Sequence, residues 1–127
     1  MAGSDVIFKN DRVEIVKNLE GSRYTIQFSG LVDDLRPGAY LDPAFDRAHS
    51  DLTLGRYGEV SVDVTGLKFL NSSGIKSFVR LIAMAGALPP AERYRMKFRY
   101  SAKVTWQPLA LKALSYLNPD LVEVVEG

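Results

Sequence analysis

The residues whose types and spacing could do chemistry lie in one short polar run, Asn71-Ser72-Ser73-Gly74. The run stands where an apolar alternation ends and a helical pattern begins, so its hydroxyls would lie in the first turn of a helix. Unpaired backbone N–H groups and the positive end of the helix dipole tolerate an added phosphate there. The alternative is that a serine only caps the helix, a role worth about 1 kcal/mol.

Residues 59–87 contain the elements that must position this run. Val60, Val62 and Val64 alternate with polar residues, which predicts a strand that ends at Gly66. After the serines the period changes from 2 to 3.6. The predicted apolar face of the following helix consists of Ile75, Phe78, Val79 and Ile82.

This strand, turn and helix resemble the signature of the STAS domain, a family named for sulphate transporters and anti-sigma factor antagonists. The family usually has Asp-Ser-Ser-Gly or Asp-Ser-Thr-Gly at the turn, and here Asn71 stands in place of the aspartate. In its bacterial regulators a partner kinase phosphorylates the second hydroxyl residue, which matches Ser73. Lys76 is a second departure, because many members have a small residue there. The resemblance covers mainly residues 60–85.

The resemblance implies a regulatory protein that binds an ATP-binding serine kinase. That kinase also holds a sigma factor, and binding of the regulator releases the sigma factor. The expected docking surface is the turn together with the outer face of the helix over residues 74–85: Asn71, Ser72, Ser73, Gly74, Lys76, Ser77 and Arg80. Because Asn71 lacks the family's charge, we place partner binding above phosphorylation of Ser73. Within the same fold, the alternative is a scaffold or lipid-transport accessory subunit without phosphorylation.

A second candidate surface is a row of cations at a spacing of two, Arg93, Arg95, Lys97 and Arg99. One strand face would present all four, and such a row could meet the phosphates of a nucleic acid. The more ordinary interpretation is that this row of cations is the solvated face of a sheet, balanced by cross-strand partners such as Asp63. The neighbouring aromatic residues point to the opposite face, which argues against base stacking.

An enzymatic role is not expected, and neither a metal nor a cofactor is implied. The chain's one histidine, His49, lies on the apolar side of a predicted helix and reads as a packed residue. Asp33-Asp34 reads as a solvated pair. The serines do not form a nucleophile elbow, and no phosphate loop is present.

Composition favours one domain spanning residues 1–127. The formal net charge of +1 gives no overall attraction to nucleic acid or anionic membrane, and the absence of cysteine excludes disulfides and thiolate metal sites. The first ten residues contain no apolar signal core, and no run approaches the roughly 18 apolar residues of a membrane span. We therefore expect a soluble, cytoplasmic protein whose oligomeric state is open.

The remaining patterns predict the element order ββαβαβαβ, with an extra edge strand through Val6-Ile7-Phe8. Residues 30–41 read as an ordinary loop, Asp42-Pro43 as the start of a helix, and residues 106–117 as the last helix. Apolar and polar residues alternate along the strands, which are not continuously apolar, so one face of the sheet should be polar. The predicted fold is therefore α/β, a mixed sheet with helices packed mainly on one face, as the STAS resemblance also implies.

Overall fold

Six strands form one mixed sheet in the computed structural model, which describes residues 2–127. The strands follow one another across the sheet in chain order, with β1 and β6 at its edges. The first three pair antiparallel and the last four pair parallel. Their bounds are β1 (Ala2–Lys9), β2 (Val13–Glu20), β3 (Arg23–Val32), β4 (Glu59–Leu70), β5 (Arg95–Tyr100) and β6 (Val122–Glu126). The predicted edge strand is confirmed as β1 and is longer than expected.

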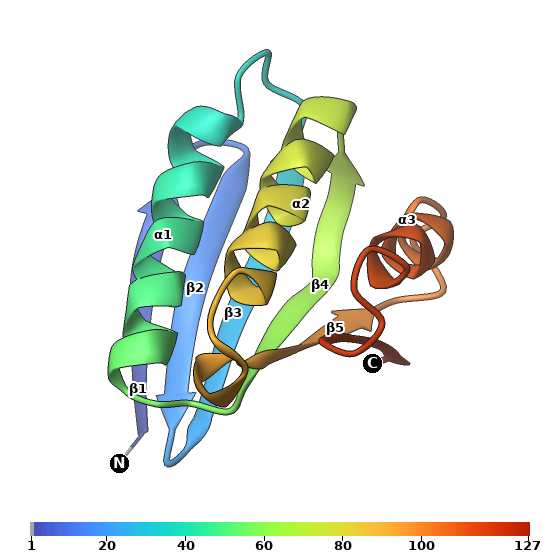
Figure 1. The fold of residues 1–127 in the computed structure, drawn as a ribbon. Helices are drawn as coiled ribbons and strands as arrows, with labels where there is room; N and C mark the ends of the chain where they lie inside the picture. The colour runs from blue at the N-terminus through green and yellow to red at the C-terminus, as the bar shows by residue number, and fades with distance from the viewer. Residues whose placement is uncertain (1) are drawn as a thin grey trace.

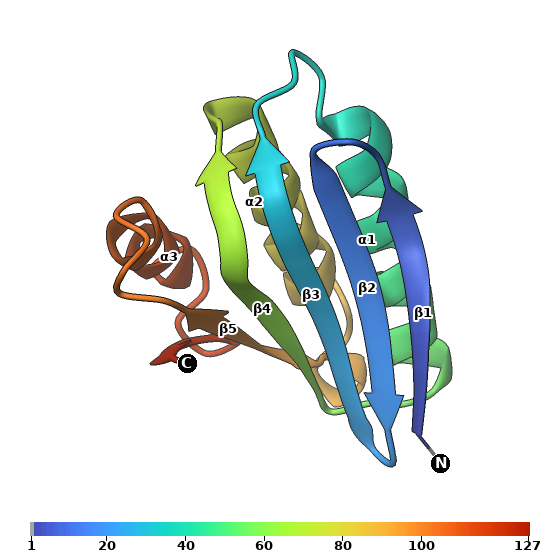
Figure 2. The ribbon, with the colours of Figure 1, turned by 180° about the vertical axis from the view of Figure 1, so that it is seen from behind.

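Two long helices cover one face of this sheet (Figure 1). They are α1 (Gly38–Leu54) and α2 (Ser72–Gly86), which pack against each other. A shorter helix, α3 (Gln107–Ser115), contacts β5 and β6, and a single 3-10 turn (Pro90–Glu92) follows α2. Seen from behind, the strands lie in front of the helices and their outer face is open (Figure 2). The predicted fold class is confirmed. Among the described residues, no helix is long and apolar enough to cross a membrane.

Alternation within the strands explains this layering. Val60, Val62 and Val64 are fully buried under the helices, whereas the residues between them are partly exposed on the open face. Four rings, one each from β3, α1, α2 and β5, meet in the centre of the core with centroids 5.1 to 6.2 Å apart: Phe28, Phe45, Phe78 and Phe98. This packing fixes α2 on the sheet and therefore fixes the position of its first turn.

The predicted start of α1 at Asp42-Pro43 is wrong. The helix begins at Gly38, and Pro43 lies inside it. Tertiary packing adds the extra turn, because Leu41 is fully buried and the Tyr40 ring stacks on Phe8 at 4.5 Å. The predicted loop over residues 30–41 is correspondingly shorter, since β3 continues to Val32 and only residues 33–37 join it to α1.

β4 does not end at Gly66 but continues to Leu70, because Leu67 and Leu70 are buried and keep the chain on the sheet. Gly66 lies where β4 approaches β3 closely, and a Cβ there would be 3.2 Å from the Cβ of Ser29. The last helix is also shorter than predicted, covering Gln107–Ser115. Gln107 is buried at its start and donates to the carbonyls of both Val64 and Leu67.

Candidate functional site

The turn between β4 and α2 is capped by Asn71 and not by a serine. Asn71 has the extended backbone of an N-cap residue (φ −78°, ψ 172°), and its Oδ1 accepts a hydrogen bond from Gly74 N at 2.8 Å. Ser72 and Ser73 form the first turn of α2, and neither hydroxyl makes a hydrogen bond within residues 2–127. The capping alternative for the two serines is therefore wrong, and both hydroxyls remain available for other contacts.

Asn71 also ties this turn to the loop that follows β3. Its Nδ2 donates to the carbonyl oxygen of Asp34 at 2.7 Å, and its backbone N donates to the carbonyl of Val32 at 3.0 Å. The side chain thus acts as acceptor and donor at once, which an ionised aspartate carboxylate cannot do because it only accepts. This gives a structural reason for an asparagine at the position where the STAS pattern has an aspartate.

Two further contacts hold the loop over residues 33–37 in place. Arg12 forms an ion pair with Asp33, and the Tyr40 hydroxyl donates to Asp34 Oδ1 at 2.7 Å. The hydrogen bond from Arg12 holds the pKa of Asp33 below its ordinary value. The two aspartates are therefore partnered and not simply solvated. They hold the loop to Arg12 and to α1, and Asn71 holds it to the turn, so the backbone of the loop is fixed from three directions.

Gly74 and Ser77, both expected at the docking surface, lie beneath it. Gly74 is buried, and a Cβ there would be 2.4 Å from Leu70 Cδ1, so the glycine allows α2 to start this close to β4. Ser77 was expected to be exposed, and this is wrong, because its side chain is only 4% exposed. Helical spacing places it on the same face as Phe78 and Leu81, facing the start of α1.

The outer side of α2 presents the remaining predicted residues. Ser72 and Lys76 are exposed, whereas Ser73 is half-buried. Arg80 is also exposed, but its guanidinium reaches α1, where it contacts Asp46 at 2.7 Å and lies 3.8 Å from Asp42. It therefore joins the two helices, and a docking partner would meet a cation that is already paired.

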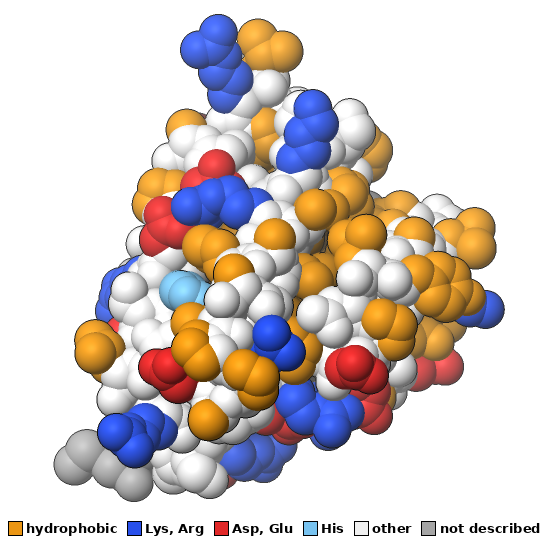
Figure 3. Space-filling model, in the orientation of Figure 1, with side chains coloured by type: hydrophobic (Ala, Val, Ile, Leu, Met, Phe, Trp, Pro, Cys, Tyr) orange, Lys and Arg blue, Asp and Glu red, His pale blue; other side chains and the backbone are white. Residues whose placement is uncertain are grey.

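Three apolar side chains near the serines are exposed, which the sequence pattern did not predict. Leu35, in the loop fixed by Asn71, is 87% exposed. Phe69, two residues before Asn71, is 46% exposed, and Val79, assigned to the buried face of α2, is 37% exposed. An apolar residue inside the polar loop Asp34-Leu35-Arg36-Pro37 was the one available signal. Hydrophobic side chains also gather over α2 and α3 on this side of the molecule (Figure 3).

We call this region the turn surface and define it by its exposed or half-buried side chains: Leu35, Phe69, Ser72, Ser73, Lys76 and Val79. It combines two hydroxyls at a helix N-terminus, one cation a turn further on, and apolar side chains around them. Burial of such apolar groups drives protein association, and the hydroxyls offer a place where an added charge would oppose it.

His49 does not belong to the turn surface. It is half-buried in the middle of α1, with its Nδ1 2.7 Å from the hydroxyl of Tyr94. Burial lowers the pKa of His49 and raises that of Tyr94. The pair joins α1 to the segment entering β5, which agrees with a packing role.

The predicted row of four cations contains three. Arg95, Lys97 and Arg99 share the open face of β5, but β5 begins at Arg95, and Arg93 turns away to donate to the carbonyl of Leu88 at 2.8 Å. Asp63, adjacent to Arg99 in the pairing register, does not pair with it within residues 2–127. Its Oδ1 accepts from the backbone N and hydroxyl of Thr65 instead.

Comparisons with known proteins support the fold. No protein-family model matches the chain, and no curated protein sequence matches it significantly. Among solved structures, the chain is similar to an anti-sigma factor antagonist from Mycobacterium paratuberculosis. The TM-score is 0.59 at 17% sequence identity, and the match covers 91% of this chain and 88% of that one. The chain therefore has the fold of an anti-sigma factor antagonist over nearly its whole length.

Proposed function

We propose that this chain is a cytoplasmic regulatory domain without catalytic activity that docks another protein through the turn surface. Its partner is of the serine kinase type that binds anti-sigma factor antagonists, and docking competes with the partner's hold on a sigma factor. The shared fold supports a regulatory role in general. The nature of the partner rests on the resemblance of the Asn71-Ser72-Ser73-Gly74 turn to the STAS signature.

The observation that carries this proposal is that Asn71, and not the serines, makes the structural hydrogen bonds at the start of α2. Asn71 caps the helix and fixes the neighbouring loop, so the serine hydroxyls have no structural hydrogen bond to maintain. Leu35, in the loop that Asn71 holds, and Phe69, two residues before Asn71, are both exposed. A site whose polar groups are free and whose apolar groups are exposed is suited to contact with a partner.

Phosphorylation of Ser73 is the regulatory step that we propose for this surface. The added phosphate would lie at the N-terminus of α2, which accommodates negative charge, so the fold would persist. A docked partner would instead cover a desolvated charge. Such a group costs several kcal/mol when it has no counter-charge, on the order of a thousandfold in affinity. Modification would therefore release the partner.

An affinity pull-down from the native host, with mass spectrometry of the captured proteins, tests the proposal. The wild-type chain, Ser73→Ala and Ser73→Asp are compared, with Ser4→Asp as the matched control. Ser4 is exposed on the edge strand β1, far along the sheet from the turn. We expect a kinase of the anti-sigma type with wild type, Ser73→Ala and Ser4→Asp, and its loss with Ser73→Asp alone.

Two other results would assign a different function. Capture of the same protein by all variants, including Ser73→Asp, would indicate a scaffold or a lipid-transport accessory subunit that needs no phosphorylation switch. Recovery of nucleic acid that is lost on Arg95→Glu, with no protein partner, would favour the open sheet face. That second function is less well supported, because Arg93 does not share the face of Arg95 and no aromatic side chain accompanies it.

A further inference from the structure

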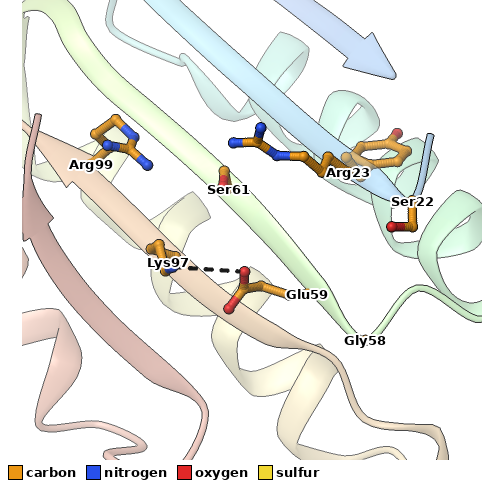
Figure 4. Close-up of a pocket in the computed structure, with 8 residues that line it drawn as sticks. Ser22, Arg23, Gly58, Glu59, Ser61, Lys97 and Arg99 are labelled. Carbon is orange, nitrogen blue, oxygen red and sulfur yellow. Dashed lines mark ion pairs between the residues drawn. The ribbon is translucent and has the colours of Figure 1, made fainter. Parts of the chain in front are cut away.

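A polar pocket lies on the open face of the sheet, on the opposite side from α1 and α2 (Figure 4). It spans β3, β4 and β5 and has a volume of about 430 Å³, within the range of small-molecule sites. Nothing in the proposed docking of a protein at the turn surface uses this pocket. Binding of a ligand in this pocket would therefore be independent of that docking.

Two of the three cations that line the pocket face each other across its middle. Arg23 of β3 and Arg99 of β5 extend toward each other across Ser61 of β4 (Figure 4). Within residues 2–127, neither guanidinium makes an ion pair or a side-chain hydrogen bond, unlike the five cations that do form ion pairs. Two unpaired positive groups that share a concave surface repel each other, and an anion between them would reverse that energy.

Negative charge in the pocket is scarce and already engaged. Glu59 is the one carboxylate among the lining residues, and it lies 3.9 Å from the ammonium of Lys97. Asp63, the nearest other carboxylate on β4, is held by Thr65. Three lining cations thus face one carboxylate, so the lining of the pocket carries a net positive charge.

The donor set matches a phosphate group. Two guanidinium forks can each donate two parallel hydrogen bonds, and the hydroxyls of Ser22 and Ser61 line the same pocket. A phosphate presents three or more oxygens and up to two negative charges, so it can accept from both forks on separate oxygens and balance both guanidinium charges, whereas a carboxylate carries a single negative charge. The ring of the lining residue Tyr24 is buried on the other face, so no aromatic platform is offered to a base.

We propose that this pocket binds the phosphate group of a small phosphorylated molecule, with Arg23 and Arg99 as the clamp. Ser61 donates from the floor between them, and Lys97 contributes a point charge at the rim. Recognition rests on the phosphate and not on a nucleobase. A polynucleotide would instead require the cations to continue along the strand, and Arg93 breaks that continuation.

Titration of the full chain with inorganic pyrophosphate, at constant ionic strength, tests this assignment. We expect saturable binding of one pyrophosphate by calorimetry, with amide NMR shifts confined to β3, β4 and β5 around Ser61. Replacement of either clamp residue, Arg23→Gln or Arg99→Gln, should weaken binding by about tenfold or more. Glu59→Gln should strengthen it, because repulsion is removed and Lys97 is freed.

Arg95→Gln is the matched control, because Arg95 lies on the same strand and face as Arg99 and carries the same charge, but it lies outside the pocket lining. Its pyrophosphate affinity should stay within about twofold of wild type. Equal weakening by all three arginine variants would overturn the proposal in favour of unspecific charge attraction. So would absence of saturation by about 10 mM pyrophosphate. Tighter binding of a single-stranded oligonucleotide, lost with Arg95→Gln, would replace it with a nucleic-acid surface.

Discussion

The most specific prediction concerns Asn71, because its side chain makes two hydrogen bonds whose contributions to stability can be measured. Removal of both in Asn71→Ala loses the helix cap, worth about 1 kcal/mol, and the hydrogen bond to the Asp34 carbonyl, worth about 1 kcal/mol more. The free energy of unfolding should therefore fall by about 2 kcal/mol. Asn71→Asp keeps a good cap and gains a charge favoured by the helix dipole. It nevertheless places an oxygen against the carbonyl of Asp34.

We expect Asn71→Asp to be destabilised by about 1 kcal/mol, between wild type and Asn71→Ala, since the lost donor bond outweighs the dipole term. Urea unfolding at neutral pH, followed by circular dichroism, measures all three free energies. Asn18→Asp is the matched control, because its side chain is half-exposed and makes no hydrogen bond among the described residues. It should change stability by less than about 0.5 kcal/mol. If Asn71→Asp were as stable as wild type, the bond to Asp34 would contribute nothing and the explanation of the asparagine would fail.

Three further predictions concern the turn surface and the core behind it. Leu35→Asp should weaken partner binding by about tenfold to a hundredfold, because burial of one leucine contributes about that much to affinity. Leu54 is a similarly exposed leucine at the far end of α1, so Leu54→Asp should not change binding in the same pull-down. Gly74→Ala should destabilise the fold by about 1 to 3 kcal/mol despite alanine's helix propensity, because its Cβ would meet Leu70; a more stable variant in urea unfolding would refute the tight packing of the turn. The pKa of His49 is lower in the folded than in the unfolded chain, so its contribution to stability is present above the ordinary value of 6.5 and is lost as pH falls below it; unfolding of His49→Gln between about pH 5 and 8 should show a shallower pH dependence than wild type.

The layout of the fold could be predicted because local pattern and tertiary burial agree in most elements. Val60, Val62 and Val64 alternate in the sequence and lie buried on one face in the structure. The change of period at the serines likewise marks the start of α2 correctly. These signals arise within a few residues, so a single sequence contains them.

The errors arise where long-range contacts override a local rule. Asp42-Pro43 is a good local helix start, but burial of Leu41 begins the helix a turn earlier. Ser77 is polar, yet it lies on the buried side of α2 because α1 packs there. Arg93 continues a spacing of two, but it precedes the strand. Each outcome depends on a neighbour that is distant in the sequence.

The candidate site was only half visible in the sequence for the same reason. The serines and the asparagine were found from their spacing, whereas Leu35 joins them only because Asn71 hydrogen-bonds to the backbone of the loop that carries it. The clamp of Arg23 and Arg99 was also missed, since β3 and β5 are not consecutive and meet only through β4.

Hydrogen exchange of the chain alone and with its captured partner is the most direct test of docking at the turn surface. We predict that the partner slows exchange in residues 33–37 and 69–80, with little change on the open face of β5 and β6. Protection confined to β5, β6 and the strand residues around Ser61, with none at the turn, would contradict it and move the docking site to the other side of the sheet.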